Sequence, residues 1–314
     1  MSGAIDWARS RVLVAGGGGF LGRHVVAALR SRGCEPVVPR TKDGWDLRRE
    51  ERAEALIAEA RPEIVIDCAA DQGGIAYVQA RPADVFTNNL LLGANLMRAA
   101  VRGGVHTYVS ALAACSYPGD VQGLLREEDY WSGPLHESVL AYGFTKKARL
   151  VQAQCYARQY GLRAVNLVLA NLYGPGDHLD PERSHALTAL LVKIVRAVRD
   201  GASEVVVWGS GDPVREWLYV EDAAEALVVG AERIEDAEPY NVGTGVGLSI
   251  RELAEKIAAL AGFAGTLRYD RSRPDGAPFK TLAVERFAKA AGWRARTSLD
   301  DGLARTLEWV RGRI

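Results

Sequence analysis

A glycine-rich turn between an apolar strand and an amphipathic helix constrains this chain more than any other feature. The apolar run Arg11–Ala15 leads into Gly16-Gly-Gly-Gly-Phe-Leu-Gly22, in which Gly16, Gly19 and Gly22 stand three residues apart. Glycines at that spacing allow a tight turn, close approach of the backbone to a pyrophosphate, and packing of the helix on the strand. The pattern therefore predicts a dinucleotide-binding turn, whose candidate cofactor contacts are Gly16, Gly19, Phe20, Leu21 and Gly22.

Strand-like apolar runs alternate with helical patterns through the first two thirds of the chain. We expect strands at 11–15, 36–39, 63–68, 106–110 and 163–169, and helices at 22–32, 48–60, 88–103 and 140–160. Repeated βα units of this kind build a parallel sheet that is covered by helices on both faces. The predicted fold class is therefore α/β, a Rossmann-type doubly wound parallel sheet with its ligand crevice at the carboxyl ends of the strands.

The length of 314 residues exceeds a typical single domain. After about residue 174 the pattern loosens into Gly174-Pro-Gly-Asp and Asp180-Pro-Glu-Arg, followed by an expected helix at 186–199 and strand at 204–208. We assign residues 1–173 mainly to a cofactor-binding Rossmann domain and 174–314 mainly to a smaller C-terminal α/β substrate-binding domain. The chain is expected to cross between the two.

Composition excludes several classes of partner. The 39 basic and 39 acidic residues balance, which removes the electrostatic argument for binding nucleic acid or an anionic membrane. No signal-like N-terminus and no run of about 18 apolar residues is present. The four cysteines lack metal-ligand spacing. We expect a cytoplasmic protein with no metal site, no nucleic-acid partner and no membrane partner.

Tyr142 and Lys146 stand four residues apart in Ala141-Tyr-Gly-Phe-Thr-Lys146. On a helix they share one face, so the ammonium could lower the pKa of the phenol and let it exchange a proton near neutral pH. The spacing alone more often means a half-buried aromatic beside a solvated lysine. The upstream glycine turn favours the catalytic interpretation, which is hydride transfer to or from a carbonyl.

Arg40 indicates the choice of dinucleotide. The second expected strand ends at Val37-Val-Pro-Arg40, where a site for NAD would carry an acidic residue for the ribose 2′-hydroxyl. A guanidinium suits a 2′-phosphate instead, so we favour NADP (as NADPH), with NAD possible; the alternative is an ordinary exposed arginine. Further candidate cofactor contacts are Asp46 and Leu47, which could border the adenine, together with Ala69 and Lys146.

Several longer sequence motifs indicate a particular family. They include Ala69-Ala-Asp-Gln-Gly-Gly-Ile75, Arg81-Pro-Ala-Asp84 with Asn89, Asn171-Leu-Tyr-Gly-Pro175, Ser184-His185, Val205-Val-Val-Trp-Gly-Ser-Gly211 with Arg215-Glu216, Tyr240-Asn-Val-Gly-Thr-Gly245 and Pro274-Asp-Gly276. With the glycine turn and Tyr142, the chain resembles the GDP-L-fucose synthase family of extended short-chain dehydrogenases/reductases over nearly its whole length. The resemblance implies a nucleoside-diphosphate 4-keto-6-deoxyhexose as substrate, with GDP as the favoured nucleotide. It also implies NADPH as hydride donor and a homodimer joined through the Tyr142 helix and its neighbour.

The resemblance also implies a cysteine and a histidine that invert the carbons flanking the ketone, and Cys115 and His185 match those positions. A proton beside a ketone is removable when the enolate is stabilised, and inversion needs a base on one face and an acid on the other. The alternatives are a small buried filler for Cys115 and a hydrogen-bonded loop residue for His185.

By the same resemblance, Tyr142 would bind the ketone and protonate the alkoxide, and Lys146 would bind the nicotinamide ribose. Recognition of the nucleotide and diphosphate would fall to Asn171, Lys193, Trp208 and Arg215. Lysine lacks the bidentate geometry of the arginine that the family often carries at position 193. The alternatives are a solvated helix face for Lys193 and core packing for Trp208.

Two positions depart from the family pattern. Ala113 stands where a serine or threonine usually helps to hold the ketone, and losing one such donor costs on the order of 3 kcal/mol, or about a hundredfold in rate. Gly17-Gly18 replaces a His-Arg pair, so the preference for NADP depends mainly on Arg40. Three functions remain open: a 3,5-epimerase and 4-reductase, an epimerase without net redox, and a non-catalytic dinucleotide-binding regulatory protein. Ser110 and Ser116 are close in sequence but would need a shift of the chain to replace the missing hydroxyl.

Arg40→Ala tests the cofactor preference. The variant should lose a charge-assisted bond to the 2′-phosphate, worth about 1.5–3 kcal/mol, and so bind NADPH roughly ten- to hundredfold more weakly. NADH binding should change little. Fluorescence titration with both cofactors makes the comparison, and equal losses for the two would overturn the choice of NADP.

Overall fold

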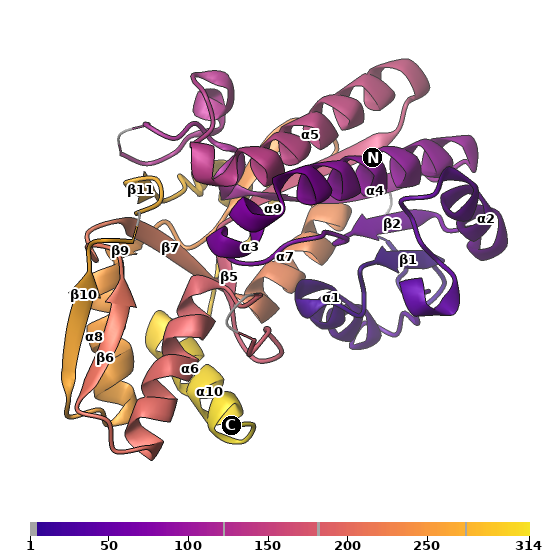
Figure 1. The fold of residues 1–314 in the computed structure, drawn as a ribbon. Helices are drawn as coiled ribbons and strands as arrows, with labels where there is room; N and C mark the ends of the chain where they lie inside the picture. Colours follow the sequence, from indigo (N-terminus) through magenta and orange to yellow (C-terminus); the bar gives the residue numbers. More distant parts are fainter. Residues whose placement is uncertain (1–4, 122, 181–182, 274) are drawn as a thin grey trace.

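The computed structural model describes residues 5–121, 123–180, 183–273 and 275–314. Pro181, Glu182 and Pro274, which belong to motifs quoted above, lie outside the described residues, as does the N-terminal segment 1–4. Figure 1 shows two regions, a large one around β1 and β2 and a smaller one around β6 and β10.

The large region is a parallel sheet of five strands in the order β1-β2-β3-β4-β8. All four pairings are parallel, which confirms the predicted fold class. Nearly every residue of these strands is buried, as expected when helices cover both faces. The strands are β1 (Val12–Ala15), β2 (Ile64–Asp67), β3 (Thr107–Ala113), β4 (Arg163–Leu169) and β8 (Pro239–Val242).

Helices cover the sheet in two groups. α1 (Phe20–Arg30) packs beside α7 (Val220–Arg233), and α4 (Pro82–Arg102) packs between α2 (Glu50–Ala60) and α5 (Leu140–Tyr160). Each group closes its own apolar cluster against the strands. The sheet is therefore doubly wound, and α4 and α5 lie side by side along one side of it (Figure 1).

Several elements differ from the sequence predictions. The strand expected at 36–39 is reduced to a single bridge between Val37 and Leu13, because the flanking Pro36 and Pro39 have no N–H to donate to the ladder. The strand expected to end at residue 110 runs on to Ala113. A short helix, α3 (Ile75–Ala80), was not predicted, and α4 begins six residues earlier than expected, with Pro82 at its start.

The smaller region contains two further sheets. β6 (Glu204–Trp208) pairs in parallel with β10 (Thr266–Asp270), while β7 (Val214–Tyr219) lies between β5 (Asn171–Tyr173) and β11 (Phe279–Lys280) and also pairs with β9 (Gly247–Ser249). α6 (Ala186–Arg199), α8 (Ile250–Ala261) and α10 (Leu299–Arg311) enclose a separate apolar core, and α9 (Glu285–Ala291) packs near β8.

The chain passes between the two regions more than once. β8 and α7 come from after residue 174 yet belong to the large sheet, whereas β5 comes from before it and joins the smaller region. The boundary at 173/174 stays a prediction about the main content of each part. Among the described residues, no helix has the length and apolar character needed to cross a membrane.

A buried ion pair ties α5 to the end of β2. Arg149 Nη1 lies 3.0 Å from Asp67 Oδ2, and the two side chains are 3% and 1% exposed. The Tyr108 hydroxyl donates to the same Asp67 oxygen at 2.8 Å. Gly93 of α4 leaves room for the guanidinium, since a Cβ there would lie 2.6 Å from Arg149 Nε. Asp67 is the last residue of β2, so this contact fixes the place at which the next loop begins.

Candidate active site

The glycine turn brings three backbone segments into contact. Gly16 has a φ of +72°, and a Cβ on it would lie 2.8 Å from the backbone of Ala69. A Cβ on Gly22 would lie 2.1 Å from the carbonyl oxygen of Gly16. α1 begins at Phe20, so its unpaired N–H groups open onto the turn. This geometry fits a pyrophosphate at the start of α1.

The remaining candidate cofactor residues surround this turn. Arg40 is exposed at the end of the Val37 segment, immediately before the short 3-10 helix Thr41–Asp43. A hydrogen bond and ion pair with Arg48, at 2.7 Å, lowers the pKa of Asp46. Leu47 is buried, and Leu21 is half-buried on α1. The Ala69 N–H donates to Asp67, which holds the loop after β2 against the turn.

Tyr142 and Lys146 lie in the first two turns of α5, both buried. Lys146 Nζ donates to the carbonyl oxygen of Ala111 at 2.8 Å and lies 5.2 Å from the centre of the Tyr142 ring. Burial, aided by the nearby Arg149 cation, lowers the pKa of Lys146 to about 7.

The expected lowering of the Tyr142 pKa is wrong. Burial raises the pKa of Tyr142, and the nearby Cys115 adds to that effect. Desolvation penalises the phenolate strongly, so the side chain holds its proton at neutral pH. The phenol is therefore a proton donor, which is the form that a ketone oxygen requires.

Cys115 packs directly on the Tyr142 region. It lies in the 3-10 turn Ala114–Ser116 after β3 and touches an apolar cluster formed by Tyr142, Val78 and Val85. A Cβ on Gly143 would lie 2.7 Å from the Cys115 carbonyl oxygen, so that glycine permits the close approach. Burial raises the pKa of the Cys115 thiol to about 11, while Lys146 and Lys280 oppose the rise.

His185 reaches both the turn and Tyr142. It caps α6, and its ring centre lies 5.7 Å from that of Phe20. Its Nδ1 lies 2.9 Å from Asp177 Oδ1, and its Nε2 lies 2.7 Å from Gln72 Nε2. The Tyr142 hydroxyl donates to Gln72 Oε1 at 2.6 Å. The fold thus joins Tyr142 and His185, which are 43 positions apart, through one carboxamide.

Three residues at this site were missed by the sequence reasoning. Gln72 lies within a motif quoted for the resemblance, and Asp177 within a loop noted only as irregular. Lys280 is buried, donates to the carbonyl oxygens of Tyr117 (3.1 Å) and Pro118, and has its pKa lowered to about 8 by burial. For Gln72 the available signal was its position inside a family motif, whereas no quoted motif and no spacing rule marks Asp177 or Lys280.

Ala113 is the last residue of β3 and offers no hydroxyl. The Ser116 hydroxyl donates to the Ala113 carbonyl oxygen and accepts from Tyr130, and Ser110 is fully buried within β3. Neither serine is bonded to Tyr142, so neither replaces the missing donor.

Two of the four candidate substrate residues, Trp208 and Lys193, lie in contact. Trp208 is 57% exposed at the end of β6, and Lys193 Nζ lies 5.1 Å from the centre of its ring. This arrangement excludes core packing for Trp208, and half-burial excludes a fully solvated Lys193. Asn171 Nδ2 donates to the Glu216 carbonyl oxygen at 3.0 Å, and burial lowers the pKa of Arg215, the residue before Glu216, to about 10.

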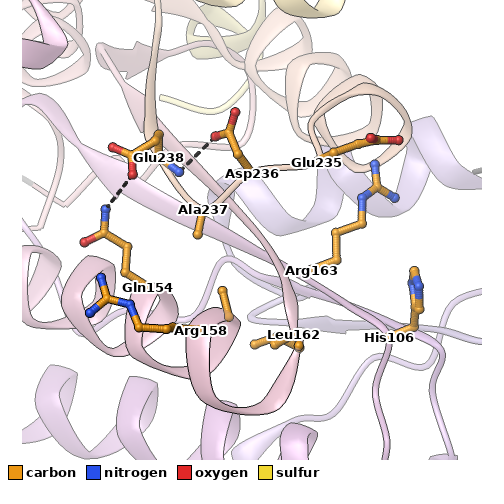
Figure 2. Close-up of a pocket in the computed structure, with 11 residues that line it drawn as sticks. His106, Gln154, Arg158, Leu162, Arg163, Glu235, Asp236, Ala237 and Glu238 are labelled. Carbon is orange, nitrogen blue, oxygen red and sulfur yellow. Dashed lines mark hydrogen bonds between the residues drawn. The ribbon is translucent and has the colours of Figure 1, made fainter. Parts of the chain in front are cut away.

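A surface pocket of about 730 Å³ lies elsewhere, between the end of α5 and the segment 235–238 (Figure 2). Apart from the end of α5, its lining includes residues that precede or open strands: His106 before β3, Arg163 at the start of β4, and Glu238 before β8. Ligands of doubly wound sheets bind outside the carboxyl ends of the strands. This pocket lies at the amino ends, so we place the functional site around Tyr142.

A family model and a curated relative both match most of this chain. The model of the NAD dependent epimerase/dehydratase family matches residues 12–243. A GDP-L-fucose synthase of Sinorhizobium fredii is 37% identical over 298 residues, which cover 95% of this chain and 94% of the relative.

Two solved structures are also similar. A GDP-6-OMe-4-keto-L-xylo-heptose reductase from C. jejuni has a TM-score of 0.93 at 25% identity, covering 99% of this chain and 100% of that one. A GDP-L-fucose synthetase from Naegleria fowleri bound to NADP has a TM-score of 0.86 at 26% identity, covering 97% and 94%.

Gly22→Ala tests the packing of the turn. The added methyl group would collide with the Gly16 carbonyl, so the free energy of unfolding should fall by about 1–3 kcal/mol. Gly18→Ala is the matched control, because a Cβ there meets nothing within 4 Å, and it should change the value by less than about 0.5 kcal/mol. Urea unfolding without added cofactor measures both. Equal losses would show that the turn is not packed in this way.

Proposed function

Because the chain belongs to the NAD-dependent epimerase/dehydratase family and, within it, to the GDP-L-fucose synthase-like nucleotide-sugar epimerases/reductases, we propose that it is a 3,5-epimerase and 4-reductase of a GDP-4-keto-6-deoxyhexose. One observation carries the proposal. Tyr142 and His185 are joined through Gln72, while Cys115 packs beside Tyr142. A proton donor for a ketone oxygen thus lies among two groups able to exchange protons at neighbouring carbons.

The cofactor is NADPH, which supplies a hydride when bound. The close-packed turn at Gly16 and Gly22 would hold the pyrophosphate, and exposed Arg40 would contact the 2′-phosphate. The NADP named with the Naegleria fowleri structure supports this choice. Lys146 would bind the nicotinamide ribose from its buried place on α5.

Epimerisation would come first. Tyr142 donates its proton toward the C4 ketone oxygen and so stabilises the enolate that forms when a neighbouring carbon loses a proton. Cys115 and His185 would serve at the two faces of the sugar, one removing a proton and the other returning one. Asp177 holds the His185 ring through Nδ1, which leaves Nε2 toward the site.

Reduction would follow at C4. The Tyr142 phenol then gives its proton to the alkoxide oxygen, a role for which its raised pKa suits the protonated resting form. Trp208 with Lys193, and Arg215 with Asn171, would recognise the nucleotide and diphosphate. Arg215 is the stronger candidate for a phosphate, because guanidinium binds it bidentately whereas Lys193 offers a point charge.

An epimerase without net redox is the second candidate, and Ala113 is the observation that favours it. The missing hydroxyl removes one donor to the oxyanion that hydride transfer creates. The third possibility, a non-catalytic dinucleotide-binding regulatory protein, has no comparable observation in its favour. We place the enzyme in the cytoplasm, which agrees with four free cysteines, Cys34, Cys68, Cys115 and Cys155.

We also propose a homodimer built on α4 and α5. Leu140, Phe144 and Val151 are exposed on one stripe of α5, and Leu90 and Leu91 are exposed on the neighbouring α4. The rings of Phe86 and Phe144, 6.3 Å apart, join the two helices at this surface. A second copy of the chain packed on this face would cover the stripe.

Isotope exchange separates the candidate functions. We expect solvent deuterium to enter C3 and C5 of a GDP-4-keto-6-deoxyhexose, as read by mass spectrometry and NMR. Cys115→Ser should slow this exchange by at least about tenfold while leaving NADPH affinity unchanged, because the thiol acts on the sugar and not the cofactor. Absence of exchange with Cys115 intact removes the epimerase assignment. Exchange without oxidation of NADPH removes the reductase assignment and leaves the second candidate.

Phe144→Glu tests the dimer. A carboxylate in the apolar stripe should shift the protein toward monomer in light scattering with size-exclusion chromatography, because a charge would be buried without a partner. Tyr160→Glu is the matched control, since Tyr160 is 56% exposed on the opposite side of the same helix. If both variants keep the mass of the unaltered protein, another surface forms the dimer or the chain is a monomer.

A further inference from the structure

The Gln72 carboxamide lies in a continuous chain of polar contacts. Tyr142 donates its hydroxyl proton to Gln72 Oε1 at 2.6 Å, and Gln72 Nε2 lies 2.7 Å from His185 Nε2. His185 Nδ1 in turn lies 2.9 Å from Asp177 Oδ1. The middle of this series of contacts is Gln72, which is not among the catalytic residues expected from the sequence.

The three hydrogen bonds of this series all donate in the same direction, from Tyr142 to Gln72, from Gln72 to His185 and from His185 to Asp177. A carboxylate at Nδ1 accepts a proton carried there, which leaves a lone pair on His185 Nε2. That lone pair accepts from the Gln72 amide N–H, and the amide oxygen is thereby turned toward the Tyr142 hydroxyl. If the amide turns over, its N–H faces the phenol oxygen and its oxygen faces Nε2, which must then carry a proton; that proton is the one His185 takes from a carbon beside the ketone during epimerisation. The phenol is then free to donate to another oxygen.

The preceding residue in the sequence, Asp71, holds the backbone at Gln72 in place. Asp71 receives hydrogen bonds from Tyr77 (2.8 Å) and Asn88 (2.7 Å), and its backbone is bonded on both sides to the buried Asn89. These contacts fix the loop against α3 and α4. The backbone at Gln72 is consequently fixed beside Tyr142 before substrate binds, and only the carboxamide has to turn about its last side-chain bond.

Because Ala113 has no hydroxyl, another polar side chain has to assist Tyr142. The side chain at that position cannot donate a hydrogen bond, and the hydroxyls of Ser110 and Ser116 are buried or bonded elsewhere. Lys146 Nζ is bonded to Ala111. Within the part of the chain that the structure describes, the polar side chain bonded to the Tyr142 hydroxyl is that of Gln72.

We propose that Gln72 is a positioning residue that replaces the missing hydroxyl at position 113 by orienting the Tyr142 phenol toward the ketone. When a ketone oxygen accepts the Tyr142 proton, the carboxamide turns over and donates an N–H to the phenol oxygen. That bond supports the negative charge that the phenol acquires as it gives up its proton. This inference rests on the proposed function, because it presumes a ketone beside Tyr142.

The test is a double-mutant cycle of Gln72→Leu and Ala113→Ser. Leucine keeps the size of the side chain but cannot form hydrogen bonds. Gln72→Leu should lower kcat for NADPH oxidation by about ten- to hundredfold, whereas KM for the nucleotide sugar should change by less than about threefold, because Trp208 and Arg215 are untouched. Ala113→Ser should restore a large part of kcat in the Gln72→Leu background but have little effect in the original chain.

The outcomes of the cycle are distinct. A purely structural Gln72 would give a loss that serine at 113 does not restore. Equal effects of Ala113→Ser in both backgrounds mean no coupling between the two positions and overturn the inference. An unchanged kcat in Gln72→Leu overturns it as well.

A second readout does not depend on turnover. The ¹⁵N spectrum of histidine-labelled protein contains five histidines, and His185→Gln assigns one of them. Gln72→Leu should shift the Nε2 signal of His185 and leave the other four unchanged. An unchanged His185 signal overturns the inference whatever the activity. If that signal shifts but the unaltered protein neither exchanges deuterium nor oxidises NADPH, the proposed function alone fails.

Discussion

The buried ion pair between Arg149 and Asp67 is the constraint on which the arrangement of the site depends. It joins α5, which carries Tyr142 and Lys146, to the end of β2, where the loop that carries Gln72 begins. Removing one partner of such a pair leaves an uncompensated buried charge at a cost of about 3–5 kcal/mol. Tyr108 and Gly93 complete the arrangement, one by hydrogen bonding to the carboxylate and the other by leaving space for the guanidinium. The helix that carries Tyr142 and the loop that carries Gln72 are therefore set relative to each other by electrostatics as well as apolar packing.

Burial has opposite consequences for the two residues that first suggested carbonyl chemistry. It raises the pKa of Tyr142 and lowers that of Lys146 to about 7, because desolvation disfavours the charged form of each. A buried, protonated phenol suits a ketone oxygen better than a phenolate would. The surroundings of Tyr142 lack a hydroxyl at Ala113 and contain the Gln72 carboxamide, so the proposed hydride step would depend on how well one amide can replace one hydroxyl.

Local pattern was sufficient where an element is long and periodic. The bounds predicted for α5 and α6 agree with the structure, as do those of β4 and β6. The predictions from local pattern failed where contacts between distant parts of the chain determine the secondary structure. Val37 forms only a bridge because two prolines flank it, and α3 is too short to show a helical period. β8 joins the main sheet after a separation of about 70 residues from β4, a pairing that no local window records.

The sequence by itself determined the residue types and the turn: glycines at the spacing that a pyrophosphate requires, Tyr142 and Lys146 one helical turn apart, and Ala113 in place of a donor. These are local properties, fixed by backbone conformation and helix periodicity. Only the tertiary structure decided what surrounds them. Gln72, Asp177 and His185 are linked to Tyr142 by hydrogen bonds between separate loops and helix starts, and the pKa of the phenol depends on its burial. Desolvation and long-range hydrogen bonds arise from packing, which spacing along the chain does not record.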